Sequence, residues 1–238
     1  GYVEFLTPTG PGAVQAALDK RGGPHLFAGG ASANDVAAVA AHLKSQSLAF
    51  DEEGGQIHID LDGEIAGLRM LVSPYEDRPR VGAIDFLYEV TLLHEDAEGA
   101  TKRFCDIFGL NAAHFSPITS ELFGYYGILT LFDPDDLHRF EVITPTAPDK
   151  TMGRFFERTG PCLYMAFGES DVMAAIEQDT NAIGGGQTID RPEARDPSRT
   201  PDQMWLHPPT LGGMMLGISR PSMAWTWSGK PERVEGID

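Results

Sequence analysis

Short strand-like runs alternate with runs of helical spacing along the chain. The stretch from 24 to 50, PHLFAGGASANDVAAVAAHLKSQSLAF, opens as a short strand and continues as an alanine-rich run with apolar positions at helical spacing. Ser32 and Asp35 are side chains of the kind that cap a helix start. The next stretch, QIHIDLDGEIAGLRMLVSP, predicts strands that are broken at Asp62-Gly63, a hairpin signal. The pattern therefore predicts a β-α-β-β-β unit.

The same order returns twice. FLYEVTLLHEDAEGATKRFCDIFGL predicts a strand and a helix, with Asp96 near the helix start and Gly109 just past its end. YYGILTLFDPDDLHRFEVITP supplies further strands. CLYMAFGESDVMAAIEQDTNAIGG again predicts strand then helix, and MWLHPPTLGGMMLGISRP predicts two closing strands. The β-α-β-β-β unit is thus used repeatedly.

A direct repeat supports this organisation. EFLTPTGPG, which begins at Glu4, returns as FEVITPTAPD around Glu141, an offset of 137 residues. At that offset the chain matches itself at Glu4, Thr7, Pro8, Thr9, Pro11, Arg21, Gly23, Pro24 and Leu26. Such a period is too long for a solenoid and suits a duplicated domain of four strands and one or two helices per half.

The net charge and the composition argue against some classes of partner and location. The net charge of -17 has the wrong sign for a phosphate backbone, so we expect no nucleic-acid partner. The sequence contains no run of about 18 apolar residues, the length that a membrane-spanning helix requires. The two cysteines, Cys105 and Cys162, form no CxxC pair and suit a reducing compartment. We therefore expect a cytoplasmic globular protein.

Two runs carry a family resemblance. FEVITPTAPDKTMGRFFERTGPCLYMAF and LHPPTLGGMMLGISRP resemble the second half of proteins of the glyoxalase I and methylmalonyl-CoA epimerase type, in the vicinal oxygen chelate superfamily. The resemblance implies an α+β fold in which βαβββ modules pair into cup-shaped mixed sheets. It also implies a divalent metal ion in the cup and a small-molecule substrate. It is less specific about the reaction, because the superfamily hosts isomerases, lyases, dioxygenases and drug-binding proteins.

The repeats then predict the domain organisation. Residues 1–74 are expected to hold a truncated first module pair: the last strand of one module, a linker helix and a second module. Residues 84–221 are expected to hold a complete second pair, and 222–238 a C-terminal tail. The charged, proline-containing run at 74–83 is the expected hinge.

The start of this sequence makes a separate prediction. Residues 2–7 are expected to form a strand that pairs with an unseen segment or with another protomer, since a lone exposed edge favours association. A homodimer is therefore allowed. Linker helices are expected at 11–21 and at the equivalent 148–158.

Strand alternation selects the first candidate site residues. Apolar side chains flank Glu4 and Glu141 on both sides, so a period of two places each carboxylate on the face opposite those neighbours. A glutamate beside Thr-Pro is usually a solvated surface residue, and it is the repeat together with the alternation that makes Glu4 and Glu141 candidate ligands.

The resemblance implies one ligand position in the first strand and one in the closing strand of each module. The first-strand position falls on His25, Glu89 and Cys162. The closing-strand position falls on Glu4, Met70, Glu141 and Gly217. The candidate metal ligands are thus Glu4, His25, Glu89 and Glu141. A histidine on an apolar strand is by default a core residue, and Cys162 is most simply a small buried hydrophobe.

These positions lead to three hypotheses of function. The first is a metal-dependent isomerase or lyase, in which the ion binds carbonyl and enolate oxygens while Glu141 or Glu89 acts as the base. The second is a non-catalytic binding protein of the bleomycin-resistance kind, favoured by Cys162 and Gly217 at ligand positions. The third is an extradiol-type dioxygenase, the weakest because two histidines and one carboxylate are not found together in the complete pair.

Overall fold

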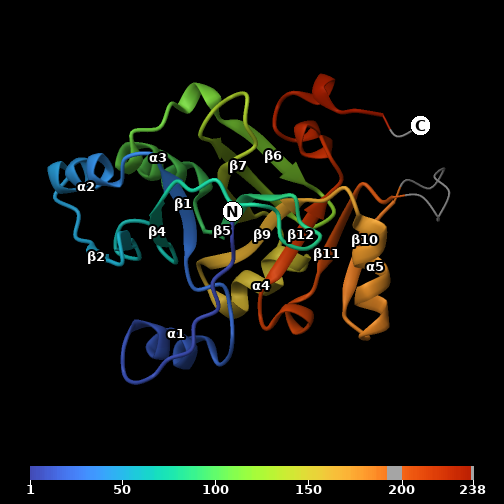
Figure 1. Ribbon diagram of the computed structural model, residues 1–238, viewed down its shortest axis with the longest axis horizontal. Coiled ribbons are helices and arrows are strands. Elements are labelled where there is room, and N and C mark those ends of the chain that lie inside the picture. The colour runs from blue at the N-terminus through green and yellow to red at the C-terminus, as the bar shows by residue number, and fades with distance from the viewer. Residues whose placement is uncertain (192–199, 237–238) are drawn as a thin grey trace. The chain divides into compact units, whose positions relative to one another are not determined.

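The structure is a computed structural model that describes residues 1–191 and 200–236, and the chain divides into two compact units. Unit 1 comprises Gly1–Phe27, Arg80–Glu89 and Tyr164–Asp238. Unit 2 comprises Ala28–Pro79 and Val90–Leu163. Figure 1 shows the helices and strands of both units.

Unit 2 begins with one βαβββ module. Its elements are β1 (Gly29–Ala33), α2 (Val36–Ser45), β2 (Asp51–Glu53), β3 (Gln56–Asp60) and β4 (Arg69–Pro74). The strand order is β1-β4-β3-β2, with β1 parallel to β4 and the other pairs antiparallel. The Asp35 side chain accepts a hydrogen bond from the Ala38 N–H, which caps α2 as the sequence predicts. These elements lie within residues 24–74, and the first strand starts later than the sequence pattern suggested.

A second module follows with the same order of elements. It contains β5 (Phe86–Leu93), α3 (Ala97–Phe108), β6 (Ser116–Ser120), β7 (Tyr125–Leu131) and β8 (Arg139–Pro145). A short 3-10 turn at Ala112–His114 precedes β6. Asp96 caps α3 through the Gly99 N–H, and Gly109 ends the helix in the left-handed conformation. Both capping residues were correctly predicted from sequence.

Unit 1 contains the third module. Its elements are β9 (Cys162–Glu169), α5 (Met173–Ala182), β10 (Gln187–Asp190), β11 (Gln203–Leu206) and β12 (Met215–Ser219). The strand order is β9-β12-β11-β10, with β9 parallel to β12. One apolar cluster joins α5 to the strands and contains Ala166, Met173, Ile176, Met204, Leu206, Leu216 and Ile218. The opposite face of this sheet is therefore the face that α5 does not cover.

Three βαβββ modules are thus present in the described parts of the chain, and the expected α+β class with mixed sheets is confirmed. The linker helices are present as α1 (Ala13–Arg21) and α4 (Thr151–Thr159). Short 3-10 turns follow in the C-terminal part at Pro208–Leu211, Met223–Thr226 and Pro231–Arg233. No described helix has the length and apolar character that crossing a bilayer requires.

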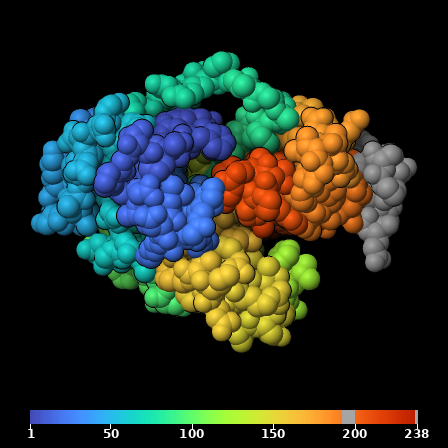
Figure 2. Space-filling model, turned by 90° about the horizontal axis from the view of Figure 1, so that it is seen from below, coloured from blue at the N-terminus to red at the C-terminus, as the bar shows by residue number. Residues whose placement is uncertain are grey.

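The N-terminal segment differs from its prediction. Residues 1–12 contain no strand, so the strand expected at 2–7 is not formed in this structure. A strand exists through hydrogen bonds to a neighbouring strand, and none of the described ladders includes this segment. Phe5 is 81% exposed, and Figure 2 shows the dark-blue N-terminal part at the molecular surface.

Candidate functional site

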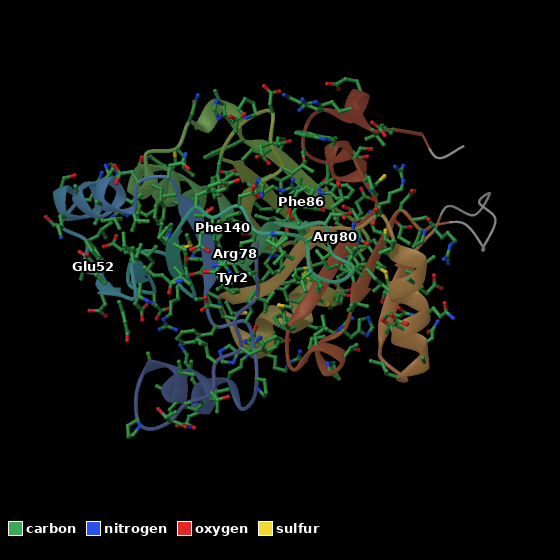
Figure 3. The ribbon with its side chains drawn as sticks, in the orientation of Figure 1. Tyr2, Glu52, Arg78, Arg80, Phe86 and Phe140 are labelled. Atoms are coloured by element: carbon green, nitrogen blue, oxygen red, sulfur yellow. The ribbon has the colours of Figure 1, made fainter. Side chains whose placement is uncertain are left out.

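Glu141 lies on the face of β8 that α3 does not cover. Its neighbour Phe140, labelled in Figure 3, packs against Phe104 of α3 with ring centroids 5.1 Å apart. Alternation along β8 therefore turns Glu141 away from α3. The side chain is nevertheless only 2% exposed.

Thr91 of β5 holds this carboxylate. Its hydroxyl donates a hydrogen bond to Glu141 Oε2 at 2.7 Å, and both side chains are buried. A hydrogen bond to a charged group is stronger than one between neutral groups, and it also restricts the orientation of the carboxylate. Thr91 thus positions Glu141.

Arg139 shares the face of β8 that carries Glu141. The two residues are two positions apart, so alternation places them side by side. Arg139 is 2% exposed, and its Nη1 donates to the Leu137 carbonyl at 3.0 Å. Because a lone buried charge is costly, opposite charges on one buried face compensate each other.

Glu89 is buried near the middle of β5. Tyr88, beside it in the strand, points to the other face, where its hydroxyl lies 3.0 Å from Ser219 Oγ and its ring stacks on Phe167. Alternation places Glu89 opposite Tyr88, on the side of β5 that also carries Thr91. The division into compact units falls between Glu89 and Val90.

In the third module, the position that corresponds to Glu141 has no room for a side chain. In the ladder of β9 and β12, Gly217 lies opposite Phe167, and a Cβ atom on Gly217 would overlap the Phe167 ring. A glutamate therefore cannot replace Gly217 without displacing this ring. The absence of a side chain at Gly217 is a packing requirement of the third module.

Aromatic side chains cover the face of the third module that α5 leaves open. The ring centroid of Phe167 is 6.3 Å from that of Trp205 and 6.2 Å from that of Trp227. Trp227 belongs to the C-terminal tail, whose Ala224 and Ser228 are buried. The tail thus docks on this face of unit 1.

Glu169 ends β9 beside this aromatic face. Alternation places it on the side of Phe167, and its Oε2 accepts a hydrogen bond from the Ser222 N–H at 3.0 Å. Burial raises the pKa of Glu169, and this outweighs the lowering by the Ser222 hydrogen bond; the nearby charges of Asp85 and Glu235 also raise it. Glu169 is therefore a tail-contacting acid that the sequence reasoning did not select.

Arg80, labelled in Figure 3, fixes the segment that leads into β5 within unit 1. Its guanidinium forms ion pairs with Asp171, at 2.8 Å, and with Asp85. The hydrogen bond to Arg80 lowers the pKa of Asp171. Ser170 adds a hydrogen bond from its hydroxyl to the Ala83 carbonyl at 2.7 Å.

Other residues selected from the sequence occupy structural positions. His25 precedes β1 and is not in a strand; its Nδ1 lies 2.9 Å from the Gly23 carbonyl oxygen. Glu4 lies in the exposed, strand-free N-terminal segment. Met70 is buried opposite Ile59 in the ladder of β3 and β4. Cys162 is half-buried, with its Sγ 3.6 Å from Thr159 Oγ1.

The positions of the described side chains test whether they could form the metal site that the resemblance implies. Within residues 1–191 and 200–236, no group of three or more His, Cys, Asp and Glu is placed to hold a metal ion. Two positions that the resemblance assigned to ligands hold Met70 in a core and Gly217 under an aromatic ring. The described side chains therefore do not fit the metal centre implied by the resemblance, and the dioxygenase hypothesis lacks its ligand set as well.

The modules share one strand order. Each described module places its first strand next to its last, in the order seen for β1-β4-β3-β2. This βαβββ order agrees with the module order that the sequence resemblance implies. No family model and no curated protein matches the chain.

Several solved structures are similar to part of the chain. Methylmalonyl-CoA epimerase from Mycobacterium tuberculosis is 15% identical with a TM-score of 0.49, over 60% of this chain and 93% of the other. A Streptomyces coelicolor methylmalonyl-CoA epimerase variant in complex with 2-nitronate-propionyl-CoA is 15% identical with a TM-score of 0.48, over 58% and 98%. A hypothetical protein from Bacillus halodurans is 11% identical with a TM-score of 0.46, over 57% and 93%. These are likenesses of fold alone.

Sequence reasoning missed three features of these faces. Thr91 and Arg139 could have been found by extending the alternation two residues from Glu89 and from Glu141. Glu169 follows Phe167 at the same spacing in the run AFGES. The hydrogen bond of Ser222 to Glu169 had no sequence signal, because the two residues are far apart in the chain.

Proposed function

We propose that this chain is an isomerase or lyase of the glyoxalase and epimerase type, which moves a proton at a carbon next to a carbonyl of a small substrate. Glu141 is the proposed base, and Glu89 is the proposed second carboxyl group at the same site. The observation that carries the proposal is the burial of Glu141, with the Thr91 hydroxyl bound to one of its carboxylate oxygens. A fixed carboxylate in such surroundings is arranged for proton transfer rather than for solubility.

The reaction can be written with the side chains of this chain alone. Glu141 takes the proton from the carbon, and the electron pair of the broken C–H bond forms the C=C bond of an enolate while the carbonyl oxygen becomes an anion. Return of the proton to either face of that carbon regenerates the ketone or ester and gives isomerisation. If the substrate carries a leaving group on the next carbon, the enolate expels it and the same first step gives a lyase.

The test is exchange of the substrate proton with solvent. A panel of acyl thioesters substituted next to the carbonyl, with methylmalonyl-CoA as one member, is incubated with the protein in deuterated water and followed by proton NMR. We expect deuterium incorporation into at least one member and a loss of about 100-fold or more in Glu141→Gln. Incorporation that is unchanged in Glu141→Gln would exclude Glu141 as the base.

A non-catalytic binding protein is the second candidate. The closure of the Gly217 position by Phe167 supports it, because one module then offers apolar contact in place of a carboxylate. A member of the panel that binds without exchanging its proton would favour this function.

A further inference from the structure

The face of β8 away from α3 carries two opposite charges in a row of apolar side chains. In the ladder of β7 and β8, Leu129 lies opposite Glu141 and Leu131 lies opposite Arg139. Both leucines are buried, and so are both charged residues. A guanidinium in such surroundings interacts with an anion more strongly than it would in water.

This arrangement coincides with the misfit of the metal ligands. The described residues contain no group of three or more His, Cys, Asp and Glu suited to an ion, and Phe167 closes the Gly217 position. A nearby positive charge offsets part of the cost of burying a carboxylate. Arg139 is a permanent charge, because its guanidinium is not deprotonated in proteins.

We infer that Arg139 performs here the electrostatic role that the superfamily resemblance assigns to a metal ion. This inference rests on the proposed proton transfer and names a further catalytic residue for it. When Glu141 removes the proton and the carbonyl oxygen becomes an anion, the Arg139 guanidinium donates hydrogen bonds to that oxygen. The site then takes small carbonyl compounds whose enolate or carboxylate oxygens can meet a guanidinium, and it works without a bound cation.

The first experiment uses oxalate, a planar anion whose oxygens imitate those of an enolate. Calorimetry is run on protein stripped of metal, with and without added Mn²⁺. We expect metal-free binding by the unmodified protein, a loss of at least tenfold in affinity in Arg139→Met and partial recovery in Arg139→Lys. Arg154→Met, a change at an exposed arginine of α4, serves as the control and should bind as the unmodified protein does.

Several results would overturn the inference. Oxalate binding that requires Mn²⁺ assigns the role to a metal, and no binding under either condition removes the anion-binding role. Unchanged binding in Arg139→Met removes Arg139 from the site. None of these measurements depends on turnover, so failure of the proposed proton transfer is recognised separately by unchanged solvent exchange in Glu141→Gln.

A double-mutant cycle protects the test against a variant that folds poorly. Arg139→Met and Glu141→Leu are each expected to lower the melting temperature, since each leaves one buried charge uncompensated. Their combination should lower it by less than the two losses added together, because both charges are then gone. Additive losses would show that Glu141 and Arg139 do not compensate each other and would contradict the inference.

Discussion

The closing strands β8 and β12 occupy the same place in their modules but present different chemistry. β8 carries Glu141 on the face away from its helix, held by Thr91 and accompanied by Arg139. β12 carries Gly217 there, covered by the Phe167 ring. The same order of strands thus carries a face with two opposite charges in the second module and an aromatic face in the third. The modules share the order of their strands and differ in the side chains on this face.

The largest expected effect comes from giving the third module the carboxylate of the second. Gly217→Glu should cost about 3 kcal/mol of folding free energy or more, because the new side chain overlaps Phe167 and places a carboxylate among buried groups. Gly30→Glu, in a strand position with open space around its Cβ, is the matched control and should cost far less. Urea unfolding measures both. Equal costs would mean that Gly217 is not a packing requirement.

The docked tail provides the next comparison. Trp227→Ala should cost about 2 kcal/mol, below the roughly 3–5 kcal/mol typical of a fully buried tryptophan, because Trp227 is only half-buried. Trp225 instead lies within 4.3 Å of the Arg233 guanidinium, measured from the ring centroid. Trp225→Ala should cost less than about 1 kcal/mol. Urea unfolding and the near-ultraviolet circular dichroism of both variants test this; the reverse order of effects would contradict tail docking through Trp227.

In the second module the equivalent test removes the hydroxyl at Thr91. Thr91→Val keeps the shape but leaves Glu141 without this donor, at a cost of about 1.5 kcal/mol. Thr91→Ser keeps a donor at the same place and should retain most of the stability and of any exchange activity. Chemical denaturation gives the first quantity and solvent exchange the second. A serine variant as impaired as the valine variant would assign the effect to the methyl group.

The smallest expected effect is a pH dependence of stability that has opposite signs for two carboxyl groups of unit 1. The pKa of Glu169 is raised above its ordinary value of 4.5, chiefly by burial, so its contribution to stability is present at low pH and is lost as pH rises through the raised value. The pKa of Asp171 is lowered below 3.8, chiefly by the hydrogen bond from Arg80, so its contribution is present above 3.8 and is lost as pH falls.

Two variants measure these opposite trends. The stability difference between the unmodified protein and Glu169→Gln should decrease as pH rises from acid towards neutral. The stability difference between the unmodified protein and Asp171→Asn should increase as pH rises through the acid range. Thermal unfolding at a series of pH values checks both signs, and parallel curves for the two variants would contradict the assigned causes.

The fold was predictable because its signals are local and repeated. Capping by Asp35 and Asp96, the helix end at Gly109 and the strand alternation around Glu141 all act over a few residues. The strand expected at 2–7 stays a prediction, because an extended segment becomes a strand only through a partner. The sequence pattern also put His25 in the first strand of its module. In the structure the ladder of β1 with β4 starts only at Gly29, so His25 lies before the strand.

The side-chain environment of the site was less accessible to sequence reasoning. Glu141 was found because its repeat marked it, but its partner Thr91 lies in another strand 50 residues earlier. The loss of a ligand position at Gly217 was visible in the sequence, whereas the ring that enforces it was not. Such contacts depend on the register of strands, which hydrophobic pattern alone leaves open.

The most direct test is an experimental structure that measures the separation of the Glu89 and Glu141 carboxyl groups. The account predicts that they approach within about 5 Å of each other or of one shared water, a separation at which two carboxyl groups can serve one reaction. Carboxyl groups more than about 10 Å apart, beyond the range in which a pair acts through an intervening water, would contradict a shared proton-transfer site.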